Sequence, residues 1–317
     1  MGKLQGKVLI TGGAGFLGSH LVEKLVTSGD VDVIVLDDLS SGFEENLQSV
    51  LSTGKAQLVK ADVRNYKAVS SVAKDCEYIF HLAAYIPNTV GHAIVTSTTY
   101  PEIDMDVTIR GTLNILRCAR LNDSKVLFAS TAAVYGEPEH LPVKENHPIQ
   151  PISPYGVAKS AAELYCELFR KLYGLKIVVA RLFNVYGPRQ RKYVVYDILK
   201  RLHDNPTELK IHGSGDQVRD FIYVEDAVEF LVLLMQKCEG VFNVGSGKAT
   251  TIRELVNIIC EEVRYSNNVR YIGKSWVGDV KALVADVSLI EKETGYRAKT
   301  TLRNGIRRTI RWFESVV

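Results

Sequence analysis

The stretch KVLITGGAGFLG, residues 7–18, combines a short apolar run with three regularly spaced glycines. The run indicates a buried strand, and a helical pattern begins at about Phe16. Gly12, Gly15 and Gly18 allow a tight turn, close approach of a pyrophosphate to the backbone, and close packing of the helix on the sheet. Because a helix N-terminus also favours anions, this strand–turn–helix pattern predicts a dinucleotide-binding site. An ordinary glycine-rich turn is the alternative interpretation.

An acidic residue stands at the distance from these glycines that dinucleotide binding requires. Asp37 ends the second apolar run, VDVIVLD (31–37), 19 residues after Gly18. A carboxylate at this place accepts hydrogen bonds from both hydroxyls of the adenosine ribose, and it repels a 2′-phosphate. The sequence therefore predicts NAD rather than NADP as the cofactor.

Further apolar runs alternate with helical patterns along the first half of the chain: AQLVKAD (56–62), CEYIFHLA (76–83), KVLFAS (125–130) and KIVVARLF (176–183). Such continuous runs are typical of parallel strands buried on both faces. They predict an α/β fold with a doubly wound parallel sheet of the Rossmann type. Beyond about residue 184 the spacing becomes irregular. We therefore expect an NAD-binding domain over residues 1–183 and a smaller C-terminal α/β substrate-binding lobe over residues 184–317, interleaved with the last strands and helices of the sheet.

The composition is ordinary for a globular protein, with 46% hydrophobic and 24% charged residues. A net charge of +3 indicates no polyanionic partner, and a solvated amphipathic helix explains the arginines near the C-terminus better than a nucleic-acid surface does. No apolar run approaches the roughly 18 residues that span a bilayer. The five cysteines are widely spaced, unlike a zinc site or a redox dithiol. We expect a soluble, cytoplasmic protein without a nucleic-acid, membrane or metal partner.

The stretch SPYGVAKSAAELY (153–165) places a tyrosine and a lysine on one expected helix. Ser153 suits the N-cap and Pro154 the first turn, and the alanines propagate the helix. Tyr155 and Lys159 are four residues apart, so they share one face. A neighbouring cation favours the phenolate and lowers a phenol pKa from about 10, so this pair can supply a base. For an isolated pair, an exposed tyrosine beside a solvated lysine is the alternative.

Motifs of one family follow one another over nearly the whole chain: TGGAGFLG (11–18), LDDLSSG (36–42), ADV (61–63), HLAA (81–84), STAAVYG (130–136), SPYGVAK (153–159), RLFNVYGPRQ (181–190), GSGDQVRDFIYVED (213–226), FNVGSG (242–247) and GDVKALVAD (278–286). With these motifs the sequence resembles the extended short-chain dehydrogenase/reductase family. Within that family it is similar to the NAD-dependent nucleotide-sugar epimerases typified by UDP-glucose (UDP-galactose) 4-epimerase.

The resemblance implies roles for three residues of a reaction centre. Tyr155 would act as the phenolate base, and Lys159 would lower its pKa while binding the nicotinamide ribose. Thr131 would bond the 4-hydroxyl of the sugar and help relay its proton. The implied reaction moves a hydride from C4 to NAD, passes through a 4-keto sugar, and returns the hydride to the opposite face.

The resemblance also implies the residues that line the two binding sites. For the cofactor they are Gly12, Gly15, Phe16, Leu17, Asp37, Asp38, Ser41, Gly42, Asp62, Val63, Leu82, Ala83 and Ala84, besides Tyr155 and Lys159. For the nucleotide sugar they are Thr131, with Asn184 and Arg219 at the phosphates, Asp279 at a ribose, His212 against the base, and Trp276 and Leu283. Taken alone, Arg219 would more often be a member of a surface ion pair, and His212 would more often be a solvated loop histidine.

Several positions separate the relatives or depart from their pattern. Dehydrating relatives carry Asp-Glu where this chain has Ala132 and Ala133, so 4,6-dehydration is disfavoured. Trp276 replaces a phosphate-clamping arginine, Thr108 replaces an asparagine, and residues 85–106 differ from the usual stretch. UDP is the favoured nucleotide, with dTDP, GDP and CDP as alternatives.

The leading hypothesis is therefore a UDP-hexose 4-epimerase acting on UDP-glucose and UDP-galactose, and on their N-acetylated counterparts. Another nucleotide-sugar epimerase, dehydratase or reductase of the same family is the alternative, and a catalytically silent NAD-binding protein is a further one. The expected helices over residues 103–120 and 156–173 are apolar on more than one face, and related enzymes pair them across a twofold axis. We expect a homodimer.

Overall fold

The computed structural model describes residues 4–85, 97–273 and 280–317. Within these residues, seven parallel strands form the main sheet in the order β10-β6-β5-β4-β1-β2-β3. Their bounds are β1 Gln5–Thr11, β2 Asp30–Asp37, β3 Ala56–Lys60, β4 Tyr78–His81, β5 Lys125–Thr131, β6 Ile177–Leu182 and β10 Gly240–Val244. The strand order reverses between β1 and β4, so the predicted doubly wound sheet is confirmed.

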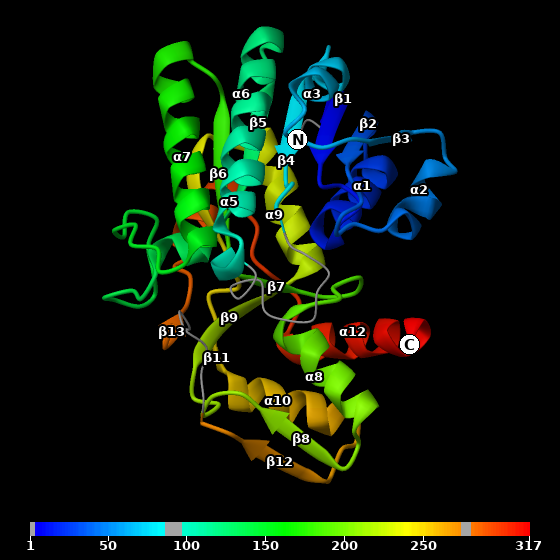
Figure 1. Ribbon diagram of the computed structural model, residues 1–317, viewed down its shortest axis with the longest axis vertical. Coiled ribbons are helices and arrows are strands. Elements are labelled where there is room, and N and C mark those ends of the chain that lie inside the picture. The colour runs from blue at the N-terminus through cyan, green and yellow to red at the C-terminus, as the bar shows by residue number, and fades with distance from the viewer. Residues whose placement is uncertain (1–3, 86–96, 274–279) are drawn as a thin grey trace.

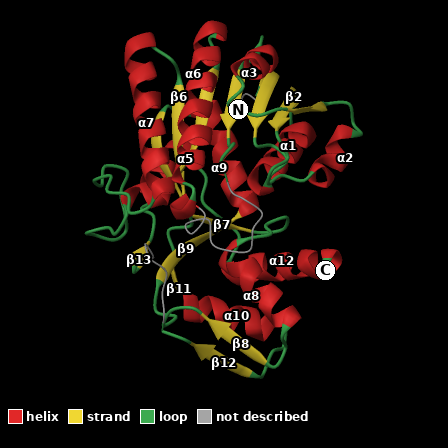
Figure 2. Ribbon diagram, viewed as in Figure 1, coloured by secondary structure: helices red, strands yellow, loops and turns green. Residues whose placement is uncertain are grey.

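Helices cover both faces of this sheet (Figures 1 and 2). Successive side chains of a strand point to opposite faces of the sheet. Val8 and Ile10 of β1 pack into one apolar cluster, and Leu9 packs into the other. The first cluster includes α1 and α9, and the second includes α3, α6 and α7. The helices are α1 Phe16–Ser28, α3 Tyr66–Ala73, α6 Gly111–Asn122, α7 Pro154–Tyr173 and α9 Val224–Lys237, with shorter elements η1 Glu44–Leu47, α2 Gln48–Leu51, α5 Pro101–Met105, η2 Asp106–Arg110 and η3 Ala132–Tyr135.

The second part of the chain builds a lobe below the main sheet in the view of Figure 1. Its strands form two small sheets, β11-β9-β13 with β7 beside β9, and β12-β8. The elements are β7 Asn184–Tyr186, α8 Tyr193–Asp204, β8 Glu208–Ile211, β9 Val218–Tyr223, β11 Ala249–Thr251, α10 Ile252–Glu262, β12 Asn268–Tyr271, β13 Ala282–Leu283, α11 Ser288–Thr294 and α12 Leu302–Val316. Because α9 and β10 return to the main sheet, residues on both sides of position 183 contribute to it. The domain limits at 183 and 184 stay a prediction.

The helix that carries Tyr155 and Lys159 begins and ends as its sequence predicts. The Ser153 hydroxyl accepts a hydrogen bond from the Gly156 amide at 3.1 Å, and Pro154 occupies the first turn. At the other end Gly174 adopts the left-handed conformation, with φ of +67°, and its amide donates to the Arg170 carbonyl. No helix of the described residues is long and apolar enough to cross a membrane.

Candidate active site

The glycine-rich turn leaves backbone exposed where the carboxyl ends of β1 and β4 meet. Gly12 has φ of +72°, and a Cβ atom on it would lie 2.8 Å from the Ala83 amide nitrogen. A Cβ atom on Gly18 would overlap the Gly12 carbonyl, which α1 approaches closely. Gly15 is the N-cap of α1. Side chains at these positions would fill a cradle that suits a pyrophosphate at the helix N-terminus.

A cavity of about 320 Å³ opens along this turn at the carboxyl edge of the sheet. The structure brings together in its lining every residue that the sequence predicts for the cofactor: Gly12, Gly15, Phe16, Leu17, Asp37, Asp38, Ser41, Gly42, Asp62, Val63, Leu82, Ala83, Ala84, Tyr155 and Lys159. These residues are far apart in the sequence, and they meet because the ends of parallel strands share one edge.

Asp37 lies at the end of β2 and is 7% exposed. Its carboxylate accepts hydrogen bonds from the Ala14 and Leu39 amides, each at 2.9 Å. Burial raises the pKa of this carboxyl, and the two amide bonds oppose the rise. Asp37 therefore ties the glycine turn to β2 in addition to lining the cavity.

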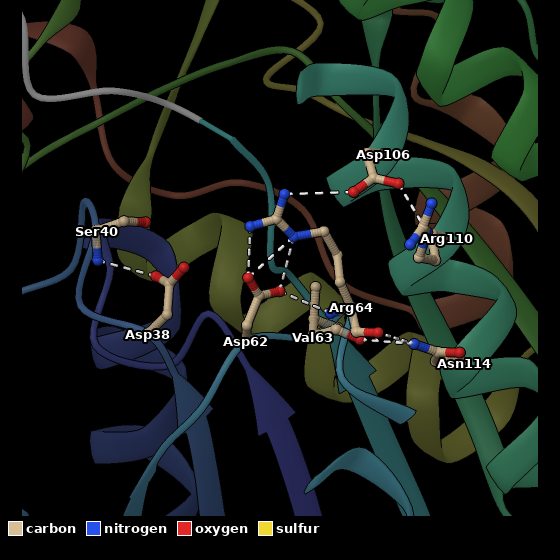
Figure 3. A network of polar contacts seen from close by, with 8 residues as sticks. All are labelled: Asp38, Ser40, Asp62, Val63, Arg64, Asp106, Arg110 and Asn114. Atoms are coloured by element: carbon tan, nitrogen blue, oxygen red, sulfur yellow. Dashed lines mark hydrogen bonds and ion pairs between the residues drawn. The ribbon is translucent and has the colours of Figure 1, made fainter. Parts of the chain in front are cut away.

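A polar network closes the cavity beside Asp62 and Val63 (Figure 3). The Arg64 guanidinium donates to both oxygens of Asp62 at 2.6 to 3.1 Å and to Asp106 at 3.3 Å. The Asn114 amide of α6 donates to the Val63 and Arg64 carbonyls at 3.0 and 2.9 Å. Bonding to Arg64 lowers the pKa of Asp62, so this carboxyl is ionised at neutral pH. The network fixes the loop after β3 against α6.

Thr131, Tyr155 and Lys159 meet where β5 ends and α7 begins. Thr131 is the last residue of β5, and its hydroxyl accepts a hydrogen bond from the Ala133 amide at 3.2 Å. The Lys159 ammonium donates to the Ala129 carbonyl at 2.8 Å and lies 5.9 Å from the centre of the Tyr155 ring. The Thr131 hydroxyl also interacts with Tyr155. The sequence prediction that Tyr155 and Lys159 share one face is confirmed, and the alternative of a solvated pair is wrong because Lys159 is 2% exposed.

Burial is the largest influence on the pKa values of Tyr155 and Lys159. It lowers the pKa of Lys159 to about 8, against the opposing effect of the acidic side chains Asp104 and Glu163. It raises the pKa of Tyr155, and the hydrogen bond with Thr131 opposes the rise only in part. Desolvation of the phenolate thus outweighs the lowering effect of Thr131, and the expectation that Lys159 lowers the Tyr155 pKa stays a prediction. Further positive charge is needed for Tyr155 to act as a base.

A second cavity, of about 450 Å³, lies on the other side of Tyr155, between the sheet and the lobe. It is lined by five residues predicted for the nucleotide sugar, namely Thr131, Asn184, His212, Arg219 and Leu283, and by Ala132 and Ala133. Trp276 and Asp279 lie outside the described residues, as do residues 86–96 of the unusual stretch 85–106. Thr108 lies in neither lining and is buried in the π-helix η2.

The polar residues of this second cavity are held by the backbone of the lobe. The Asn184 amide donates to the Asp220 carbonyl at 3.0 Å, and the Arg219 guanidinium donates to the Val218 carbonyl at 2.9 Å. His212 is half-buried, and burial together with the charge of Arg201 lowers its pKa, so the ring is neutral at pH 7. His212 lies in a bend after β8, so both its role against the base and the alternative of a loop histidine stay predictions.

Gln190 and Tyr193 line both cavities, and sequence reasoning missed them. Gln190 is the last residue of the motif RLFNVYGPRQ, and Tyr193 follows it in an irregular turn with φ of +70°. This conformation is rare for a side chain of that size and is characteristic of functional sites. The one signal in the sequence was that this turn adjoins the motif RLFNVYGPRQ (181–190).

Comparison with known proteins agrees with this geometry. The family described as GDP-mannose 4,6 dehydratase matches residues 9–309. The chain belongs to this family of extended short-chain dehydrogenases/reductases. A curated relative, a putative UDP-glucose 4-epimerase of Methanocaldococcus jannaschii, is 37% identical over 97% of this chain and 98% of its own. Another, UDP-glucuronic acid decarboxylase 1 of Arabidopsis thaliana, is 31% identical over 99% of this chain and 71% of its own.

Two solved structures of the family are similar over almost the full length. One is a UDP-glucose 4-epimerase of Thermotoga maritima with UDP-glucose, with a TM-score of 0.89, 35% identity, and coverage of 98% of this chain and 99% of that one. The other is a UDP-N-acetylglucosamine 4-epimerase of Methanobrevibacter ruminantium with UDP-N-acetylmuramic acid, with a TM-score of 0.91, 33% identity and full coverage of both chains. The family thus contains epimerases, decarboxylases and dehydratases of nucleotide sugars.

Proposed function

We propose that this enzyme catalyses NAD-dependent epimerisation at C4 of a UDP-hexose. The observation that carries the proposal is the position of Tyr155, which lines the cofactor cavity and the substrate cavity at once, with Thr131 and Lys159 beside it. A C4 hydroxyl bound next to Tyr155 would face the cofactor cavity. That is the arrangement needed for a reversible oxidation at one carbon.

The cofactor cavity fits NAD because the glycines leave the cradle for a pyrophosphate and Asp37 stands at the ribose end. When bound, NAD accepts a hydride and supplies a positive nicotinamide ring. Tyr155 takes the proton of the C4 hydroxyl and later returns it, while Thr131 holds that hydroxyl through a hydrogen bond. Lys159 keeps a positive charge beside the phenolate and offers donors to ribose hydroxyls. Asn184 and Arg219 would hold the phosphates while the sugar ring turns to present its other face.

Neighbouring residues favour epimerisation over the other reactions of the family. Dehydration requires an additional acid and base after Thr131, and Ala132 and Ala133 cannot transfer a proton. A decarboxylase or another nucleotide-sugar epimerase remains the second candidate, because such relatives are similar over most of the chain. A silent NAD-binding protein has no need of all three reaction-centre residues. The five cysteines are free and buried, which supports a reducing, cytoplasmic location.

The test is incubation of the purified enzyme with UDP-glucose, UDP-galactose and a panel of other nucleotide sugars, followed by NMR of the products. We expect interconversion of C4 epimers without net consumption of NADH. Tyr155→Phe should abolish turnover and leave nucleotide-sugar binding largely intact, whereas Thr131→Val should lower the rate by roughly 10² to 10⁴. Stoichiometric use of NADH, loss of carbon dioxide, or full activity of Tyr155→Phe would contradict the proposal.

A further inference from the structure

Asp104 is a buried carboxylate next to the reaction centre that none of the roles above uses. It lies on α5, which packs against α7, and is 1% exposed. Its Oδ1 atom has no hydrogen-bond partner in the described structure. A buried ionisable oxygen without a partner is costly, so its presence calls for an electrostatic or catalytic explanation.

One further oxygen near Asp104 shares this property. Thr108 follows Asp104 by four residues through a continuous helical backbone, so both side chains lie on the same face. The Thr108 hydroxyl is also buried without a hydrogen-bond partner, whereas Ser97 interacts with the Asp104 carboxyl. The contrast with Asp106 is clear, because that carboxylate is paired with Arg64 and Arg110 on another side (Figure 3). The helix therefore places one paired and one unpaired carboxylate only two residues apart.

The charge that Asp104 faces is the ammonium of Lys159. Burial raises the pKa of the Asp104 carboxyl, and a hydrogen bond with Ser97 and the charge of Lys159 oppose the rise. The charge of Asp104 in turn raises the pKa of Lys159. Asp104 also faces the two phenols of the site, and its negative charge raises the pKa values of Tyr155 and Tyr193. The other ionisable groups described around Lys159 are Glu163 and Cys166 on α7 and the neutral His81 on β4.

We propose that Asp104 is a positioning residue of the reaction centre, which holds Lys159 as an ammonium ion and thereby sets the pH range over which Tyr155 accepts a proton. A negative charge stabilises the protonated form of each neighbour, whether that form is a cationic lysine or a neutral tyrosine. The carboxylate therefore keeps Lys159 charged in a site where burial favours the neutral amine. It also moves both titrations of the Tyr155–Lys159 pair toward higher pH.

The experiment removes this charge and follows the two titrations. In Asp104→Asn, both limbs of the pH profile of kcat/KM should move to lower pH by roughly one unit, because removing one nearby charge lowers both pKa values. Glu102→Gln is the matched control, since Glu102 is an exposed acid on the same short helix and should leave both limbs in place. Asp104→Glu, which restores the charge, should restore the positions of the limbs. A lower plateau with unmoved limbs in Asp104→Asn would overturn the proposal.

The kinetic test rests on the proposed function. A second measurement does not depend on it. The ultraviolet absorbance of tyrosinate is followed against pH in each protein at saturating NAD. The same titration is carried out on the Tyr155→Phe variant of each protein, and the difference between the two curves is the titration of Tyr155. We expect a lower apparent pKa for Tyr155 in Asp104→Asn than in the parent. Asp104→Ser removes the same charge without added volume and gives the same test if the asparagine variant does not fold. An unchanged Tyr155 titration in these variants would refute the role of Asp104 whether or not any sugar is converted.

Discussion

Arg181 and Glu163 form a buried, bidentate ion pair directly behind the strand that ends at Thr131. The guanidinium donates to the two carboxylate oxygens at 2.7 to 3.2 Å, and both side chains are almost fully buried. Glu163 also accepts from the Ser130 hydroxyl, and Arg181 donates to the Tyr135 hydroxyl at 2.9 Å. One helix turn separates Glu163 from Lys159, so this pair joins the helix of Tyr155 and Lys159 to β5 and β6.

Removing one partner of this pair should strongly destabilise the fold. Glu163→Ala leaves the Arg181 charge buried without a counterion, so we expect the free energy of unfolding to fall by about 3 to 5 kcal/mol. Glu167→Ala is the control, because Glu167 lies one turn further along α7 and forms only exposed ion pairs. Urea unfolding of both variants without ligands measures the difference. Equal stability of the two variants would contradict the assigned role.

The main sheet could be predicted because its strands are buried on both faces and therefore appear as continuous apolar runs. The glycine turn and the helix after Ser153 could be predicted because each depends on local chemistry. Tyr193 could not, since a left-handed turn rather than a periodic pattern brings it to Tyr155. The rise that burial causes in the Tyr155 pKa could not be predicted for a related reason, because burial is a property of the folded chain. The burial of Asp104 could not be predicted either, since an acidic residue in a helix ordinarily faces solvent.

Asp37 should make the enzyme selective for NAD over NADP. Its buried carboxylate stands at the end of β2, where a 2′-phosphate would meet a negative charge with little solvent to screen it. Isothermal titration calorimetry should give at least about tenfold weaker binding of NADP, which is about 1.4 kcal/mol. Asp37→Asn should reduce this ratio and also weaken NAD binding, because the bonds to Ala14 and Leu39 hold the turn. Equal affinities in the parent protein would refute the assignment.

The exposed face of α7 should pair with a second copy of this chain. Val157, Leu164, Leu168 and Leu172 recur at helical spacing and are between 45% and 69% exposed. A contiguous apolar stripe of this kind is typical of an interface. Light scattering should therefore give twice the 35.2 kDa mass of one chain. Leu164→Lys with Leu168→Lys should give monomers, whereas Val316→Lys at the exposed end of α12 is a control for adding charge. A monomeric parent protein at micromolar concentration would contradict the prediction.

Leu283 should determine how large a substituent the sugar can carry. It lies on β13 beside Arg219 of β9, lines the substrate cavity, and packs with Phe183 and Ala132. A tyrosine at this position would be larger and would extend a hydroxyl into the space that a 2-acetamido group needs. A roomy apolar pocket discriminates weakly, by about 1 to 3 kcal/mol, so we expect activity on both UDP-glucose/galactose and their N-acetylated counterparts.

Leu283→Tyr should therefore remove activity on the N-acetylated pair selectively. Because Leu283 is only 7% exposed, the larger side chain can also strain the packing against Phe183 and Ala132. Such strain lowers the free energy of unfolding by about 1 to 3 kcal/mol. Leu283→Met, which nearly conserves volume, separates this packing effect from the loss of space. The measurement is kcat/KM for both sugar pairs in the three proteins, with the melting temperature of each. The ratio of the two pairs should fall at least about tenfold in Leu283→Tyr and stay unchanged in Leu283→Met. A parent protein inert toward UDP-N-acetylglucosamine, or an equal ratio in Leu283→Tyr, would show that another residue limits the sugar.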